Sequence, residues 1–278
     1  MRHFFCMLAV GGICSLALPH DLLADAGPSG SAQSLQAGAR FRVARTARVR
    51  GSITLQDGQQ FPVRMLRQIE FVEEVQRLRE GRAAEVSREL IKAQVRQTDP
   101  ETGAEEVEIL GRAGQSYRLS FDADGSRVSP GQGGYPGENL AEALKDALDR
   151  GLLPAGERRE GQTRSLNGGE ISRNFASLAM RGGQARLRVV GFERDRDTDL
   201  RVARIRGEIS TQILLDDLPV SYEAKVEAVI PVELRVPFMV KLEGRLSGRG
   251  SFETEGGQTI AYMLSGEASA VQVAAPAS

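Results

Sequence analysis

Histidine, cysteine and tryptophan are almost absent from this chain of 278 residues. It has two histidines, two cysteines and no tryptophan, and the four histidines and cysteines all lie in the first twenty residues, at His3, Cys6, Cys14 and His20. Residues 21–278 therefore lack the imidazole that most often serves as general base or metal ligand, and the thiolate that serves as nucleophile. They also cannot form a disulfide. We expect a protein that is not an enzyme and that binds no cofactor or metal.

The first 26 residues have the layout of a cleavable export signal. Arg2 supplies a positive charge, residues 4–18 are apolar, and Ala24-Asp25-Ala26 is a small-x-small cleavage site. The apolar segment is too short to cross a hydrocarbon core of roughly 30 Å at about 1.5 Å per residue. We expect cleavage after residue 26, no transmembrane span in the remaining chain, and a periplasmic or extracellular location.

Neither sign of charge is in excess. The chain has 36 basic and 37 acidic residues, whereas proteins that bind nucleic acid carry a basic excess. We therefore expect no nucleic-acid partner.

The dominant pattern is the alternation of apolar and polar residues, which indicates β-strands. Seven segments show it: residues 39–55, 61–75, 82–97, 107–110, 117–121, 185–192 and 202–215. With the segments discussed next, ten or eleven strands are expected. We predict a mainly-β fold of two antiparallel, curved β-sheet halves, half-barrel or sandwich-like, joined by one α-helix.

The chain divides into six parts on this basis. They are a signal peptide (1–26), a flexible tether rich in Gly, Ser, Ala and Gln (27–38), an N-terminal β-rich half (39–135), a helix and connector (136–160), a C-terminal β-rich half (161–274) and a tail (275–278).

The longest alternation covers residues 225–246, with apolar residues at even positions and mostly charged residues at odd positions. A two-residue hairpin loop would exchange the two faces, and a three-residue loop would need Gly or Asn, which the middle of the run lacks. We therefore predict one long, bent strand. Pro231 and Pro237 lie on its polar face and indicate an edge or a bend.

A hairpin follows around Glu255-Gly256-Gly257, where Gly257 can adopt positive φ. The loop sets a register in which each of the four outer pairs contains a small residue, opposite a large one in three of them. The predicted pairs are Thr254 with Gln258, Phe252 with Ile260, Gly250 with Tyr262, Gly248 with Leu264, Leu246 with Gly266 and Gly244 with Ala268.

One helix is expected at residues 138–150. Leu140, Leu144 and Leu148 recur at a spacing of four, Gly151 suits the position after the last turn, and Pro154 stops continuation. A shorter helical turn is expected at residues 171–180.

The strand–turn unit at residues 117–128, which ends in FDADGSRV, is followed by this helix and then by residues 153–161 leading into the second half. This order resembles an uncharacterised family of exported bacterial β-rich proteins, often lipoproteins, over about residues 39–270. The resemblance implies no established activity, cofactor or site residue. The lipid-bearing cysteine of such lipoproteins is missing, because Ile13 precedes Cys14 where a small residue is required.

Acidic clusters offer the only candidate chemistry. Asp122 and Asp124 begin like a calcium loop, but its twelfth position is Gly133, so a β-turn is predicted. The triplet Asp195, Asp197 and Asp199 alternates with arginines and predicts a solvated hairpin tip.

Glu70, Glu73 and Glu74 could supply a carboxylate pair for a hydrolase, which we keep as the weaker alternative. Serine-hydrolase motifs are absent, and the glycines of residues 131–137 do not follow the order of a phosphate loop. We name no catalytic, cofactor-binding or metal residue, and the ligand-binding residues are not defined by the sequence.

The apolar strand faces have two readings. They build the protein's own core, or they form a concave surface for a lipid or other apolar ligand. Small residues would leave a groove on it, or let the helix lie close and fill it: Gly244, Gly248, Gly266 and Ala268. We therefore expect a non-catalytic envelope protein, a binding or interaction module whose partner is another envelope protein. The alternative is a carrier of an apolar ligand.

Overall fold

The computed structural model describes residues 37–275 apart from ten short segments: 80–81, 100–101, 123–124, 132–133, 146–158, 173–178, 197–198, 216–217, 233–238 and 254–257. Several predictions lie outside the described residues. They concern the signal peptide, most of the tether, the second half of the 138–150 helix, most of the connector, the 255–257 loop and residues 276–278.

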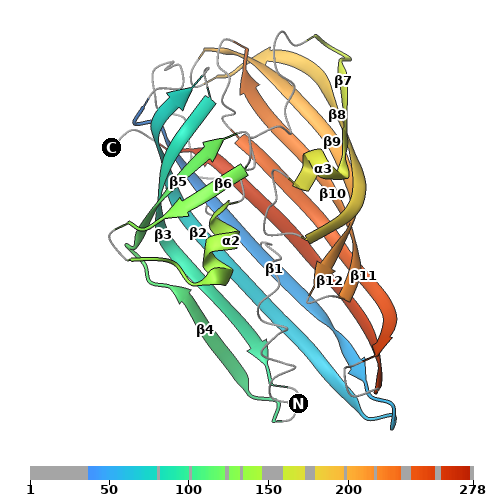
Figure 1. The fold of residues 1–278 in the computed structure, drawn as a ribbon. Coiled ribbons are helices and arrows are strands. Elements are labelled where there is room, and N and C mark those ends of the chain that lie inside the picture. Colours follow the sequence, from blue (N-terminus) through green and yellow to red (C-terminus); the bar gives the residue numbers. More distant parts are fainter. Residues whose placement is uncertain are drawn as a thin grey trace.

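The described chain forms one antiparallel sheet of twelve strands (Figure 1). The strands are β1 (Arg40–Thr54), β2 (Gln60–Arg79), β3 (Arg82–Thr98), β4 (Glu105–Gly111), β5 (Ser116–Asp122), β6 (Gly125–Ser129), β7 (Thr163–Asn167), β8 (Ala179–Arg194), β9 (Arg201–Leu215), β10 (Leu218–Pro231), β11 (Met239–Glu253) and β12 (Thr259–Ala274). The predicted mainly-β, antiparallel and curved fold is confirmed.

The spatial order of the strands is β6-β5-β3-β2-β1-β12-β11-β10-β9-β8-β7, with β4 paired to one end of β3. β1 and β12 pair along their whole length, from Phe41 opposite Ala274 to Thr54 opposite Ala261. The first and last strands therefore lie at the centre of the sheet, and the two β-rich halves are its two wings. Among the described strands the order ends at β6 and β7, so the sheet is open.

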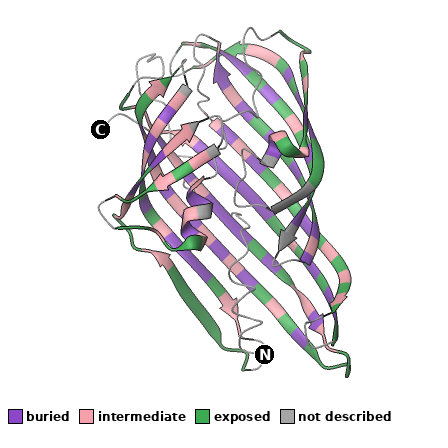
Figure 2. Cartoon of the chain, in the orientation of Figure 1, coloured by how far each residue is buried: buried purple, intermediate pink, exposed green. Residues whose placement is uncertain are grey.

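Alternation along the strands separates the two faces of the sheet. We call inner the face on which both helices lie; it carries Val43, Ala47 and Val49 of β1, which are at most 2% exposed. Buried positions recur along the long strands of both wings (Figure 2). One continuous hydrophobic cluster runs from Val43 in β1 to Ile213 in β9, so both wings share a single core.

The structure corrects the long strand predicted at residues 225–246. β10 ends at Pro231 and β11 begins at Met239, and the two strands pair antiparallel, with Val226 opposite Leu242. Nine residues separate the innermost pair, Val229 and Met239. Because the number of intervening residues is odd, even-numbered residues face inward in both strands. The alternation therefore continues although the chain reverses its direction. The prediction failed because it weighed only two- and three-residue loops.

The predicted register of the next hairpin is confirmed. Phe252 pairs with Ile260, Gly250 with Tyr262, Gly248 with Leu264, Leu246 with Gly266 and Gly244 with Ala268. The remaining predicted pair, Thr254 with Gln258, involves a residue outside the described part of the chain.

The described residues include two short helices, which lie on the inner face (Figure 1). α2 (Glu138–Lys145) begins where the sequence predicts. α3 (Gly168–Ser172) begins three residues earlier than expected, and β8 already starts at Ala179. The side chains and backbone of Asn167 and Glu170 bond reciprocally, at 3.0 and 2.9 Å. This capping arrangement fixes the start of α3.

Candidate functional site

Three arginines are buried on the inner face, on three neighbouring strands. Arg45 of β1, Arg67 of β2 and Arg88 of β3 are each 2% exposed. Arg45 and Arg67 occupy positions of the alternation that otherwise carry apolar residues, such as Val43 and Ile69. Charged residues at apolar positions were the signal from which the sequence could have identified this cluster.

Arg88 points inward for a different reason. The register of β3 against β2 shifts between Lys92, opposite Glu70, and Leu90, opposite Phe71, so Ile91 is an extra residue. This β-bulge changes which residues of β3 face inward. Ala93 is buried on one side of it and Arg88 on the other, while Ile91 is 39% exposed.

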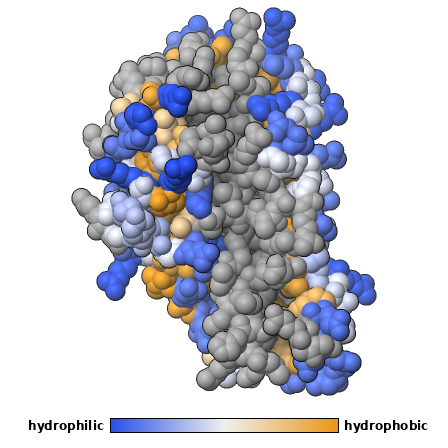
Figure 3. All heavy atoms as spheres, viewed as in Figure 1, coloured by the Kyte–Doolittle hydropathy of each residue, from blue (hydrophilic) through white to orange (hydrophobic). Residues whose placement is uncertain are grey.

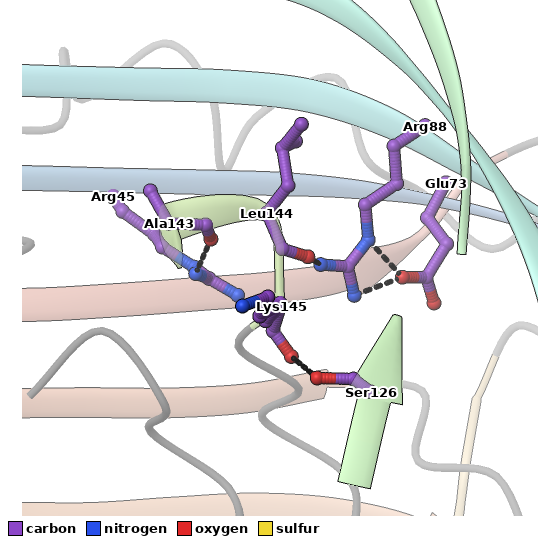
Figure 4. Close-up of polar contacts among 7 residues, drawn as sticks. All are labelled: Arg45, Glu73, Arg88, Ser126, Ala143, Leu144 and Lys145. Carbon is purple, nitrogen blue, oxygen red and sulfur yellow. Dashed lines mark hydrogen bonds and ion pairs between the residues drawn. The ribbon is translucent and has the colours of Figure 1, made fainter. Parts of the chain in front are cut away.

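All three arginines hold α2 by donating to its backbone carbonyls. Arg45 Nη1 donates to Ala143 O at 2.8 Å, Arg88 Nη1 donates to Leu144 O, and Arg67 Nη2 donates to Asn139 O at 3.0 Å. Figure 4 shows the first two of these contacts. A backbone carbonyl oxygen carries partial negative charge, so a guanidinium group that donates to it stabilises it.

Two of the guanidinium groups lie close to the ring of Phe71. The Cζ of Arg45 is 5.5 Å from the ring centroid and that of Arg88 is 4.7 Å from it. Arginine is favoured for such contacts because its planar group stacks on aromatic faces. Phe71 thereby contacts two like charges.

Arg88 has a buried acid beside it. Arg88 donates to the Glu73 carboxylate from Nη2 at 2.5 Å and from Nε at 2.7 Å (Figure 4). Among the described residues, the buried charged side chains are these three arginines and Glu73. The described residues of the inner face therefore include three buried positive charges and one buried negative charge.

Some buried side-chain nitrogens on this face have no hydrogen-bond partner. Nε and Nη1 of Arg67 have no hydrogen-bond partner, and neither has Nε2 of Gln272 in β12. Buried polar groups are nearly always paired, since an unmade bond costs about 1–3 kcal/mol. These atoms are therefore the strongest indication of a site in the described part of the chain.

The acids considered as hydrolase candidates do not gather on one face. Glu73 lies on the inner face with Arg88, whereas strand alternation places Glu70 and Glu74 on the outer face. There Glu70 pairs with Arg42 at 2.6 Å, and Glu74 pairs with Arg40 at 4.0 Å.

The two aspartate clusters lie at hairpin ends. Asp122 pairs with Gly125, as expected for a turn between β5 and β6. Asp199 lies between β8 and β9 and bonds Arg194 at 2.8 Å, both side chains being exposed. Asp124 and Asp197 are outside the described residues. No group of three or more described His, Cys, Asp or Glu residues is placed to hold a metal ion.

Tyrosine rings lie over three of the inner-face glycines. A Cβ on Gly244 would meet the Tyr222 ring, and one on Gly248 or Gly250 would meet the Tyr262 ring. The described part of α2 instead bonds to β1, β2 and β3. The small residues thus make room for aromatic side chains of neighbouring strands.

The hydroxyl of Tyr262 donates to Pro219 O at 3.0 Å, and burial raises its pKa above the ordinary value of 10.0. Above about pH 10 the unfolded chain loses this proton more readily than the folded protein, so the free energy of unfolding should fall as pH rises. In urea unfolding between pH 8 and 11, Tyr262→Phe should make the decrease of the free energy of unfolding with pH less steep. Tyr135→Phe, at a site 79% exposed, should leave the slope unchanged; equal slopes for all three proteins would contradict the assignment.

Comparison with known proteins adds little. No family model and no curated protein matches the chain. A solved structure from Nitrosomonas europaea, provisionally named AttH, is 12% identical, with 90% of this chain and 96% of that chain covered and a TM-score of 0.14. A TM-score this low carries no argument about fold or function. No helix in the described residues is long and apolar enough to span a bilayer.

Proposed function

We propose that this chain is an exported, non-catalytic binding protein that acts in the periplasm or outside the cell, with the inner face of its sheet as the binding surface. The layout of residues 1–26 supports export. The lack of histidine and cysteine in residues 27–278 supports a role without catalysis.

The observation that carries the proposal is the state of Arg67. Its guanidinium is buried, two of its three nitrogens lack partners, and no buried acid among the described residues remains for it once Glu73 has bonded Arg88. Such a group lowers the stability of the protein unless something binds to it. A protein that retains such a side chain at its core is expected to use it for binding.

The apolar remainder of the inner face favours a small ligand with an apolar part. Val43, Ala47 and Val49 of β1 and Leu264 and Ala268 of β12 are all buried there. On the side of the molecule drawn in Figure 3, the described residues at the two margins are mostly hydrophilic, with hydrophobic patches among them. A carrier of a lipid or other apolar ligand is the form of binding that this arrangement supports best.

Native mass spectrometry of the protein purified from the exported fraction of its own cells tests this function. We expect a complex with a small molecule that is released by organic solvent. Repeated isolation with a second polypeptide and no small molecule would contradict the carrier and favour an interaction module. The same spectrum gives the mass of the mature chain, so a protein that retains residues 1–26 would contradict export by a cleaved signal.

A further inference from the structure

We infer that the inner face binds an anionic oxygen group, a carboxylate or a phosphate, at Arg67, and that this group is the head of an amphiphile whose apolar chain lies on the neighbouring strands. This inference rests on the proposed function and names the chemical class of its ligand.

The charge balance of the inner face argues for an anion. Arg88 is neutralised by Glu73, whereas Arg67 has no buried acid beside it among the described residues. The backbone carbonyls of α2 supply only partial charges. An anion at Arg67 would add the missing negative charge and would accept from Nε and Nη1, which have no partner. Hydrogen bonds in which both partners are charged are the stronger kind.

The strand register brings a second unused donor to the same region. Arg45 lies opposite Ile69 on β2 and opposite Ala270 on β12. On the same face, Arg67 lies two positions along β2 from Ile69, and Gln272 lies two positions along β12 from Ala270. Both are therefore diagonal neighbours of Arg45, at a separation that long side chains can bridge. Arg67 thus lies on one side of Arg45, and the Nε2 of Gln272, which has no hydrogen-bond partner, lies on the other side.

Apolar side chains adjoin this cluster along the sheet. In the row of Arg67, the facing residues are Val95 of β3, Ala47 of β1 and, beyond Ala47, Ala268 of β12. All three are at most 3% exposed. A hydrocarbon chain joined to a head at Arg67 would thus contact apolar side chains, in the place of the protein atoms that now cover them. A free inorganic anion would make no such contact.

The test is calorimetric titration of the mature protein, stripped of ligand and checked by mass, with five probes. Dodecanoate and dodecyl phosphate carry both parts of the ligand, dodecanol lacks the charge, and acetate and inorganic phosphate lack the chain. We expect the two charged amphiphiles to bind, and the other three to bind about tenfold more weakly or not at all.

The variant Arg67→Met tests whether Arg67 supplies the charge that binds the head group, since methionine has an unbranched side chain without a charge. Arg64→Met is the matched control, because Arg64 is an exposed residue of the same strand. We expect Arg67→Met to weaken dodecanoate binding at least about tenfold and Arg64→Met to leave it unchanged. The ligand-free Arg67→Met protein should be at least as stable as the unmodified protein, since a buried unbalanced charge is removed.

The possible outcomes distinguish a failure of the anion site from a failure of the proposed function. Equal binding of dodecanol and dodecanoate, or equal dodecanoate binding by Arg67→Met, would overturn the anion site and leave the apolar carrier standing. Binding of acetate or inorganic phosphate as tight as their dodecyl counterparts would overturn the amphiphile. If no dodecyl compound binds, both proposals fail. A marked loss of stability in ligand-free Arg67→Met would assign Arg67 to the support of α2 and overturn its role as an anion site.

Discussion

Replacing Glu73 with glutamine should lower the free energy of unfolding by about 3–5 kcal/mol, because it leaves Arg88 as a buried cation without its anion. Glu73 and Arg88 are 7% and 2% exposed at their side chains and form two close contacts. Urea unfolding followed by circular dichroism measures the change. Loss of this pair also loosens the Arg88 contact to Leu144 O, so the 138–145 helix should exchange its amide hydrogens faster.

Glu70→Gln is the matched control on the same strand. Glu70 pairs with Arg42 on the outer face at 2.6 Å, where the Arg42 side chain is 42% exposed, and an exposed pair contributes about 0–1 kcal/mol. Replacing both Glu73 and Arg88 with leucine should recover much of the lost stability, since a buried pair exchanged for apolar residues is often neutral. Equal losses in Glu73→Gln and Glu70→Gln would refute the importance of the buried pair.

Gly266→Ala should destabilise the protein by about 1–3 kcal/mol, the usual cost of overpacking. Gly266 lies on β12 opposite Val49 of β1, in the seam that joins the two wings. An added Cβ would overlap the backbone carbonyl oxygen of Arg48. Because that atom belongs to the partner strand and not to a flexible side chain, relief requires β1 and β12 to separate. The midpoint of urea unfolding measures the effect.

Gly191→Ala on β8 serves as the control, because nothing lies within 4 Å of the position its Cβ would take. Alanine is conformationally less costly than glycine in a strand, so this variant should be neutral or slightly more stable. If Gly266→Ala were equally well tolerated, the close approach of β1 and β12 at the seam would be wrong.

Local patterns predicted most of the strands because most inward positions carry an apolar side chain. The pairing from Phe252 with Ile260 to Gly244 with Ala268 could be derived in full, since a hairpin loop sets the register of both its strands. The same reasoning failed between Pro231 and Met239, where an odd number of residues preserves parity through a chain reversal. Whether a residue is at an odd or an even position shows on which face of the sheet its side chain lies. It does not show in which direction the strand runs.

The candidate site was only partly accessible to such reasoning. Arg45, Arg67 and Glu73 interrupt apolar positions of β1 and β2, and this departure is visible in the sequence. Arg88 joins them only because a bulge at Ile91 shifts the register of β3. That the partners of the arginines are backbone carbonyls of α2 could not be inferred, because carbonyl groups have no sequence signature.

The sequence by itself determined that this protein is built from strands with one apolar face, and that residues 21–278 contain no imidazole or thiol. Both follow from the identity and spacing of side chains. Only the tertiary structure decided that β1 and β12 meet at the centre of one sheet, and that three arginines gather under one short helix with a single buried acid among the described residues. These features depend on contacts between residues far apart in the chain, whose energies no local pattern contains.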